Sequence, residues 1–278
     1  MSDPARNAAG YSHEAIDRTV RVLEAFSGDG PLSLAEVARS ASLNDATALR
    51  YLTSLCNHGL VERVPESGRY RLGIRLFELG QRALLGRDPR QLARPYMEAL
   101  LSQFEETVNL AMHHGDELIV IEVIESRQSI KKGAMVGERD RWHASSLGKA
   151  ILAQMPASEA ERLVSSTGLL PLTQSTITSA DVLFEQLAAV RELGYAVDDE
   201  ETLENLRCAG AAVFDRHGIP AYALSVAGPK DRIPARRLRE IGAAVQLAAS
   251  ALSAELGHTV APSLDGLAAR SLTDAGPA

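Results

Sequence analysis

The sequence has few cysteines, few aromatic residues and no long apolar run. Of its 278 residues, two are cysteine and 4% are aromatic. Cys56 and Cys208 cannot form a disulfide framework, which favours a reducing compartment. No stretch approaches the roughly 18 consecutive apolar residues of a membrane-spanning helix, and the first residues lack the charged and apolar regions of a signal peptide. We therefore expect a soluble, cytoplasmic protein without a membrane partner.

Lysine is absent from the first 85 residues. That segment holds ten arginines and ten acidic residues, so its net charge is zero, whereas the whole chain has a net charge of −7. The excess negative charge therefore lies after residue 85. An arginine-only, neutral segment on an acidic protein can bind DNA only through a local basic face. Charge alone does not decide whether DNA is a partner.

Three short helices are predicted near the N-terminus. Within residues 12–26, apolar side chains recur at helical spacing. They are Ile16, Val20, Leu23 and Phe26. Ser33 and Glu36 form a capping box that begins a second helix, which ends near residue 40. Asn44 is the predicted N-cap of a third helix, and Gly59 follows its end.

A hairpin follows the third helix. Strands are predicted over residues 60–64 and 69–72, because the Pro-Glu-Ser-Gly sequence between them supplies turn residues. Three helices, the last two joined by a short turn, and then a hairpin make up a winged helix-turn-helix. We predict this domain over residues 12–73, after a flexible N-terminus at residues 1–11.

The third helix carries the candidate DNA-reading face. Its core face is formed by Ala48, Leu52, Leu55 and Cys56. The opposite face can enter a major groove, where an arginine donates two hydrogen bonds to guanine. The alternative is an ordinary solvated helix face, but arginines on the hairpin favour DNA because they can contact phosphates. The candidate DNA-contacting residues are Arg18, Asp45, Ala46, Thr47, Arg50, Arg69 and Arg71.

The rest of the chain predicts a linker helix and a second domain. Residues 74–87 read as the linker, and Asp88-Pro89 supplies an N-cap and a first-turn proline for the next helix. Over residues 88–257, β-hairpins alternate with single helices, which indicates an α+β domain rather than βαβ repeats. Residues 258–278 lack periodicity and are predicted to be a disordered tail.

Two blocks of the sequence resemble IclR-type transcriptional regulators. In the N-terminal part they are Ile16-Asp17-Arg18, the segments 32–38 and 47–55, Gly59-Leu60-Val61 and the segment 70–73. In the second domain they are the segments 194–201, 207–210 and 213–215, with further matches at 109–111, 143–150 and 224–229. The resemblance covers about residues 13–257. One position departs from it, because Ala209 is smaller than the aliphatic residue usual there.

The resemblance implies a GAF-like or profilin-like effector domain that binds a small molecule. The ligand-contacting positions carried over from the family are Ser146, Leu147, Asp198, Cys208 and Ser225. Independently of the family, the segment 145–148 begins a helix whose backbone amides can receive a carboxylate. Each residue has a plainer interpretation: Ser146 as a helix N-cap, Asp198 as part of a solvated acidic loop, and Cys208 as an inert buried thiol.

The expected function is a DNA-binding transcriptional regulator, more specifically a repressor, whose operator binding a small organic acid modulates. Ala227 stands where many relatives have a second serine, so a less polar acid is favoured. The resemblance implies a homodimer, or a tetramer of two dimers. We expect no cofactor, and no metal because His113 and His114 are adjacent on a strand and face opposite sides.

Two alternatives remain. The chain could be an enzyme built on the sensor fold, with Cys208, His143 and Asp198 imitating a thiol triad, although no nucleophile elbow supports this and no catalytic residue is assigned. It could also be a ligand-binding scaffold that does not bind operator DNA. Turnover of a substrate would identify the enzyme, and an absence of salt-sensitive DNA affinity would identify the scaffold.

Overall fold

The computed structural model describes residues 13–26, 30–83 and 88–259. The chain divides into two compact units, residues 1–86 and 87–278. The N-terminus predicted to be flexible at residues 1–11, and nearly all of the predicted tail at 258–278, lie outside the described residues.

The N-terminal unit is the predicted winged helix-turn-helix. Its elements are α1 (Glu14–Glu24), α2 (Leu34–Ser40), α3 (Asp45–Asn57), β1 (Val61–Arg63), β2 (Tyr70–Leu72) and α4 (Ile74–Ala83). Both predicted caps are present. The Ser33 hydroxyl accepts from the Glu36 amide at 3.3 Å, and Glu36 Oε2 accepts from the Ser33 amide at 2.7 Å. Asn44 Oδ1 accepts from the Thr47 amide at 2.8 Å.

The two-stranded wing is antiparallel and closes tightly on the end of α3. Val61 pairs with Leu72, and Arg63 pairs with Tyr70. A Cβ atom at Gly73 would lie 2.1 Å from the carbonyl oxygen of Gly59, so only glycine fits at position 73. The hairpin geometry therefore depends on this close backbone approach.

Only part of the apolar stripe of α1 faces the core, because Leu23 and Phe26 pack against it and the other two residues do not. Ile16 and Val20 are 63% and 45% exposed, whereas Val22 and Ala25 are buried. Val22 and Ala25 pack in one cluster with residues of α2 and α3. Ile16 and Val20 lie on another side of the helix, which no buried cluster of the described residues covers.

The C-terminal unit is built on a five-stranded sheet. Its elements are α5 (Pro89–Phe104), β3 (Thr107–His114), β4 (Glu117–Ile124), α6 (Ser146–Gln154), α7 (Ala157–Thr167), α8 (Ala180–Leu193), β5 (Ala196–Asp199), β6 (Leu206–Val213), β7 (Tyr222–Pro229) and α9 (Ala235–Glu255). The strand order is β4-β3-β7-β6-β5, and every neighbouring pair is antiparallel. The predicted α+β class is thus confirmed.

Three elements of this unit differ from the sequence prediction. The apolar segment 219–227 predicts a strand, but β7 begins only at Tyr222, because Pro220 has no amide to donate to a ladder. The helix α7 was not predicted, because its buried face is only Ala160, Leu163 and Val164. The strand β5 is four residues long and lies at a sheet edge, which is too short for an alternation signal.

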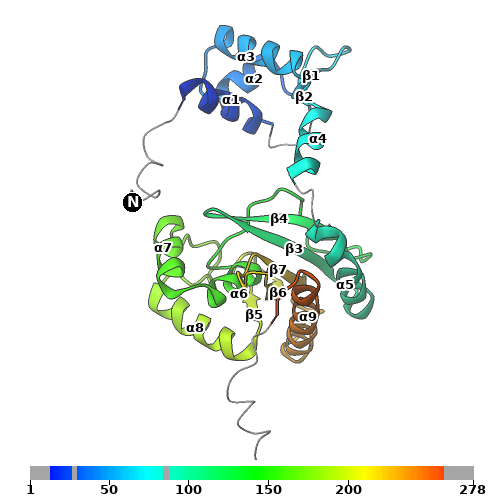
Figure 1. Ribbon diagram of the computed structural model, residues 1–278, viewed down its shortest axis with the longest axis vertical. Coiled ribbons are helices and arrows are strands. Elements are labelled where there is room, and N and C mark those ends of the chain that lie inside the picture. Colours follow the sequence, from blue (N-terminus) through cyan, green and yellow to red (C-terminus); the bar gives the residue numbers. More distant parts are fainter. Residues whose placement is uncertain (1–12, 27–29, 84–87, 260–278) are drawn as a thin grey trace, which may run out of the picture. The chain divides into compact units, whose positions relative to one another are not determined.

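Helices cover both faces of the sheet (Figure 1). On one face α5 and α9 pack against alternate strand residues such as Leu110, Leu224 and Val226. On the other face the cluster that includes α6, α7 and α8 contains Ala111 and Ala223. Side chains alternate between the two faces along a strand. The buried polar residues that alternate with the apolar residues of the first face therefore lie on the second face.

Candidate functional site

The predicted DNA-reading face of α3 lies on the surface of the N-terminal unit. Asp45, Ala46 and Arg50 are exposed and Thr47 is half-buried. The residues predicted for the core face behave as expected, since Ala48, Leu52 and Leu55 are buried and Cys56 is half-buried. Leu49, which the sequence analysis did not single out, is 44% exposed on this helix. The sequence signal that could have added Leu49 is an apolar residue outside the core face of this helix.

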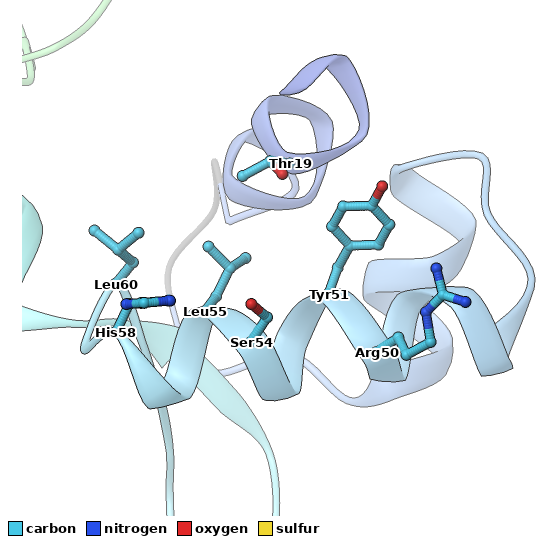
Figure 2. Close-up of a pocket in the computed structure, with 7 residues that line it drawn as sticks. All are labelled: Thr19, Arg50, Tyr51, Ser54, Leu55, His58 and Leu60. Atoms are coloured by element: carbon cyan, nitrogen blue, oxygen red, sulfur yellow. The ribbon is translucent and has the colours of Figure 1, made fainter. Parts of the chain in front are cut away.

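Arg50 lies at the edge of a groove between α1 and α3. The groove has a volume of about 350 Å³ and is lined by Thr19, Arg50, Tyr51, Ser54, Leu55, His58 and Leu60. Figure 2 shows Thr19 on α1 facing α3, with Arg50 at the far end of the helix from His58. Arg50, Ser54 and His58 are four residues apart and therefore form one stripe of α3. Within the described chain, Arg50 has no salt bridge, so its guanidinium is available to a ligand.

The other predicted arginines already have acidic or carbonyl partners. Arg71 pairs with Glu62 at 2.9 Å. Arg69 donates to the carbonyl oxygen of Pro31 at 2.8 Å and lies 3.5 Å from Glu36. Arg18 forms a salt bridge with Glu14 on the same helix. These pairs are at the surface, where a salt bridge contributes only about 0–1 kcal/mol, so a DNA phosphate can replace the carboxylate.

Replacing Arg69 and Arg71 together with alanine should weaken binding to operator and to random DNA by the same factor. Both side chains are on the wing, where phosphate contacts position the protein without reading bases. Each lost phosphate contact should make the slope of log affinity against log salt shallower by roughly 0.9. Titrations at several salt concentrations measure both effects. A loss confined to operator DNA would show instead that the wing reads bases.

The strand register gathers the predicted effector residues on the second face of the sheet. Asp198 on β5 lies opposite Cys208 on β6, which lies opposite Ala227 on β7. Ser225 lies two residues from Ala227 and opposite Gly210. Since directly opposed residues and residues two apart share a face, these side chains form one polar patch.

The start of α6 completes this patch. A Cβ atom at Gly210 would lie 3.0 Å from the carbonyl oxygen of Ser146, so the helix begins directly above the sheet. Ser146 is therefore next to the strand positions of Ser225 and Cys208. Leu147 is buried in the apolar cluster of α6 and α8. All five predicted effector residues are buried.

The N-cap of α6 is Ser145, so the interpretation of Ser146 as the cap is wrong. Ser145 Oγ accepts from the Gly148 amide at 3.0 Å and donates to the carbonyl oxygen of Arg141 at 2.8 Å. Because this bond occupies one of the amides considered for binding a carboxylate, only those of Ser146 and Leu147 stay at the helix start. The helix start is therefore a weaker anion site than the sequence suggested.

Asp198 is buried, which overturns its interpretation as part of a solvated loop. One carboxylate oxygen accepts from the amides of Glu201 and Thr202 at 2.8 and 3.2 Å, and the other accepts from the Thr202 hydroxyl. Burial raises the pKa of Asp198, although these hydrogen bonds oppose the shift. The side chain thus fixes the loop that follows β5.

Cys208 is a buried thiol that stays protonated. Burial and the nearby charge of Asp198 raise its pKa well above the usual value. Because the thiolate is the nucleophilic form, this environment disfavours the thiol-triad alternative. His143 is also buried, and burial lowers the pKa of its imidazole.

Lys149 and Glu201 form a buried salt bridge that the sequence analysis missed. The Lys149 ammonium lies 2.5 Å from a Glu201 carboxylate oxygen, and the lysine side chain is 0% exposed. Burial raises the pKa of Glu201 to about 7, even though Lys149 opposes the shift. A lysine within the otherwise apolar start of α6 was the available signal.

Lys132 and Asp140 were also missed. Both side chains are half-buried and lie on the segment 126–140. This segment is attached to β3, because the Thr107 hydroxyl donates to the carbonyl oxygen of Lys132 at 3.3 Å. Burial lowers the pKa of Lys132, but electrostatic interactions with neighbouring groups, Asp140 and Asp198 among them, outweigh burial and raise it. Lys132 therefore interacts electrostatically with the polar patch on the sheet.

No group of three or more His, Cys, Asp and Glu side chains in the described part of the chain could hold a metal ion. His113 packs edge-to-face against Trp142 with ring centroids 5.1 Å apart. No helix among residues 13–26, 30–83 and 88–259 is long and apolar enough to cross a membrane.

A winged helix-turn-helix unit and a second unit with a buried polar site on an antiparallel sheet define a two-domain, ligand-modulated DNA-binding regulator. Comparisons with known proteins agree. The model of the IclR helix-turn-helix domain matches residues 15–65, and that of the bacterial transcriptional regulator IclR C-terminal domain matches residues 81–254. The chain belongs to the IclR family of bacterial transcriptional regulators.

Curated relatives and solved structures extend over most of the chain. It is 34% identical to the transcriptional repressor IclR of Escherichia coli over 88% of this chain and 90% of that protein. It is 32% identical to the regulator KdgR of Escherichia coli, over 89% and 94%. A similar solved structure is that of an IclR homologue from Microbacterium hydrocarbonoxydans complexed with 4-hydroxybenzoate (TM-score 0.76, 28% identity, 87% and 98% covered).

Proposed function

We propose that the protein is a repressor whose affinity for operator DNA changes when a small organic acid binds in its C-terminal unit. The observation that carries this proposal is the combination of an exposed α3 face around Arg50 with a buried polar patch that includes Asp198 and Ser225. Several relatives are named repressors, which supports repression over activation. The acid is supported by the 4-hydroxybenzoate complex of the Microbacterium relative.

The proposed effector residues are Ser146, Leu147, Asp198, Cys208 and Ser225, and the proposed DNA contacts are those of α1, α3 and the wing. Because the effector residues are buried, binding must be accompanied by movement of the surrounding chain. An effector changes DNA affinity only if it binds the DNA-competent and DNA-incompetent arrangements unequally. The proposed boundaries are residues 12–73 for DNA binding, 74–87 for the linker and 88–257 for effector binding.

The DNA-bound form is proposed to be a homodimer. Ile16 and Val20 on α1, and Ile74 and Phe77 on α4, are exposed apolar residues of the N-terminal unit. A second copy of this chain would cover such side chains, and a dimer would place two α3 helices in half-sites about 34 Å apart. Two copies also compensate for the zero net charge of residues 1–85, because phosphate contacts add.

The protein is proposed to act in the cytoplasm without catalysing a reaction. The family consists of proteins named as transcriptional regulators, and the protonated, buried Cys208 thiol is unsuited to nucleophilic attack. A scaffold that does not bind DNA is disfavoured by the exposed, unpaired Arg50 on α3.

Replacing Asp198 with asparagine should remove the effector response and leave operator binding within about twofold of the wild type. The amide keeps one acceptor oxygen for the loop, but it cannot offer the same charge to a donor on the effector. The measurement is a titration of the protein–operator complex with the acid that acts on the wild type. Asp199→Asn is the matched control, because Asp199 is the exposed neighbour paired with Arg207. A wild-type response in Asp198→Asn would contradict the proposed site.

A further inference from the structure

Besides the paired Lys149 and Glu201, the polar patch holds one further cation and two carboxylates. Lys132 interacts electrostatically with Asp140 and Asp198. It makes no salt bridge within the described part of the chain, although its neighbour Lys131 pairs with Glu125 at 2.6 Å. Partial burial of an ammonium without a direct partner costs free energy. A ligand group that pairs with it therefore gains more binding free energy than it would at the surface.

An acidic effector requires a cation in this patch. Asp140 and Asp198 repel a carboxylate, and the start of α6 offers it only the amides left by the Ser145 cap. The partial positive charge of a helix start does not by itself outweigh two nearby carboxylates. Lys149 is already paired with Glu201, so Lys132 is the nearby cation that can pair with a ligand.

A second, independent observation is an unsatisfied acceptor next to the patch. Asn109 is 1% exposed, and its Oδ1 atom has no hydrogen-bond partner. Its Nδ2 atom makes only a long bond of 3.4 Å to the hydroxyl of Ser225. Buried amide oxygens are nearly always satisfied, so this one points to a missing donor.

The strand register gives the distance between the row of Asn109 and the row at which Lys132 is held. Asn109 and Ser225 form one row of the sheet, and Thr107, Ala227 and Cys208 form the next row on the same face. Lys132 is held at the second row by its carbonyl bond to Thr107. Rows two residues apart in a strand are separated by about 6.6 Å. A small molecule can therefore span both.

We propose that Lys132 and Asn109 bind the effector, with Lys132 pairing with the carboxylate of a small hydroxy acid and Asn109 accepting a hydrogen bond from its hydroxyl group. This inference rests on the proposed function of the same site and specifies the chemical class of its ligand. Lys132 determines the specificity for an acid over a neutral molecule, and Asn109 determines the specificity for a hydroxyl-bearing acid over its deoxy analogue.

The test uses the full-length protein and four probes: glycolate, lactate, 3-hydroxybutyrate and 4-hydroxybenzoate, each with its primary amide and its deoxy acid. Calorimetry should show at least one hydroxy acid binding roughly tenfold or more tightly than its amide, because only the charged carboxylate pairs with the Lys132 ammonium. Lys132→Met should lose this preference, and Lys132→Arg should retain it. Asn109→Ser should reduce the preference for the hydroxy acid over its deoxy analogue.

Lys131→Met is the matched control, because Lys131 is exposed and paired with Glu125. It should bind the acid as the wild type does. Unchanged acid affinity in Lys132→Met, equal affinity for acid and amide, or no binding by any acid to a wild-type protein that binds its upstream DNA would each overturn the inference. A wild-type protein that fails to bind DNA would instead contradict the proposed function. Urea unfolding of Lys132→Met at the same midpoint as the wild type shows that the C-terminal unit of the variant is folded.

Discussion

Replacing Lys149 with methionine should lower the free energy of unfolding by about 3–5 kcal/mol, the usual consequence of removing one partner of a buried ion pair. Glu201 would then be a buried carboxylate without its cation, and its Oε2 atom already lacks a hydrogen-bond partner. Methionine has similar length and leaves no large cavity. Urea unfolding at pH 7.5 measures the loss.

The effect should depend on pH in one direction. The pKa of Glu201 in the folded protein is about 7, above its ordinary 4.5, so the folded state prefers the protonated carboxyl and this contribution to stability is lost as the pH rises from about 4.5 through 7. Without Lys149 the pKa rises further, because the opposing charge is gone. The variant should therefore differ less from the wild type at pH 5 than at pH 7.5.

The double variant Lys149→Met, Glu201→Gln provides the control. Removing both charges should restore a large part of the lost stability, since an apolar or neutral pair is often as stable as a buried ion pair. A Lys149→Met protein within about 1 kcal/mol of the wild type at pH 7.5 would contradict the burial and pairing of these two residues.

The sequence predicted features that depend on neighbouring residues, such as helix caps. It did not predict features that depend on packing between distant segments. Ser33 and Asn44 were predicted as caps because a cap and its partner lie within three residues. The helical spacing of apolar residues on α1 did not show which of them face the core: Leu23 and Phe26 pack against it, whereas Ile16 and Val20 are exposed.

For the effector site, the family resemblance supplied residues and the register showed how they meet. Asp198 and Cys208 are ten positions apart in sequence but directly opposed in the sheet. The salt bridge between Lys149 and Glu201 joins residues 52 positions apart, and no local pattern pairs them. Lys132 lies in a segment without regular structure, so periodicity could not assign it to a face.

Replacing Arg50 with alanine should weaken operator binding by about 1–3 kcal/mol, roughly 5- to 150-fold, the usual contribution of an arginine that donates two hydrogen bonds to guanine. Arg50 is exposed on α3, opposite the buried Ala48, Leu52 and Leu55. Its substitution leaves the core untouched, so unfolding should be unchanged. Thr47→Ala should have a smaller effect, because Thr47 is half-buried and its hydroxyl is a weaker donor than a guanidinium.

The effect should be specific to operator sequence. Random DNA should be bound about equally by Arg50→Ala and by the wild type, apart from the loss of one charge. Arg236→Ala is the matched control, because Arg236 is an exposed arginine on α9 with a helical salt bridge to Glu240. It should leave operator affinity unchanged.

The most direct test of DNA recognition through α3 is a mobility-shift titration of the purified protein against the DNA upstream of its own gene and against random DNA of equal length. The wild type should bind the upstream DNA at least about tenfold more tightly, and Arg50→Ala should lose most of that difference while Arg236→Ala keeps it. Equal binding of the two DNAs by the wild type, or an Arg50→Ala protein within twofold of it, would contradict the assignment of α3 as the recognition helix.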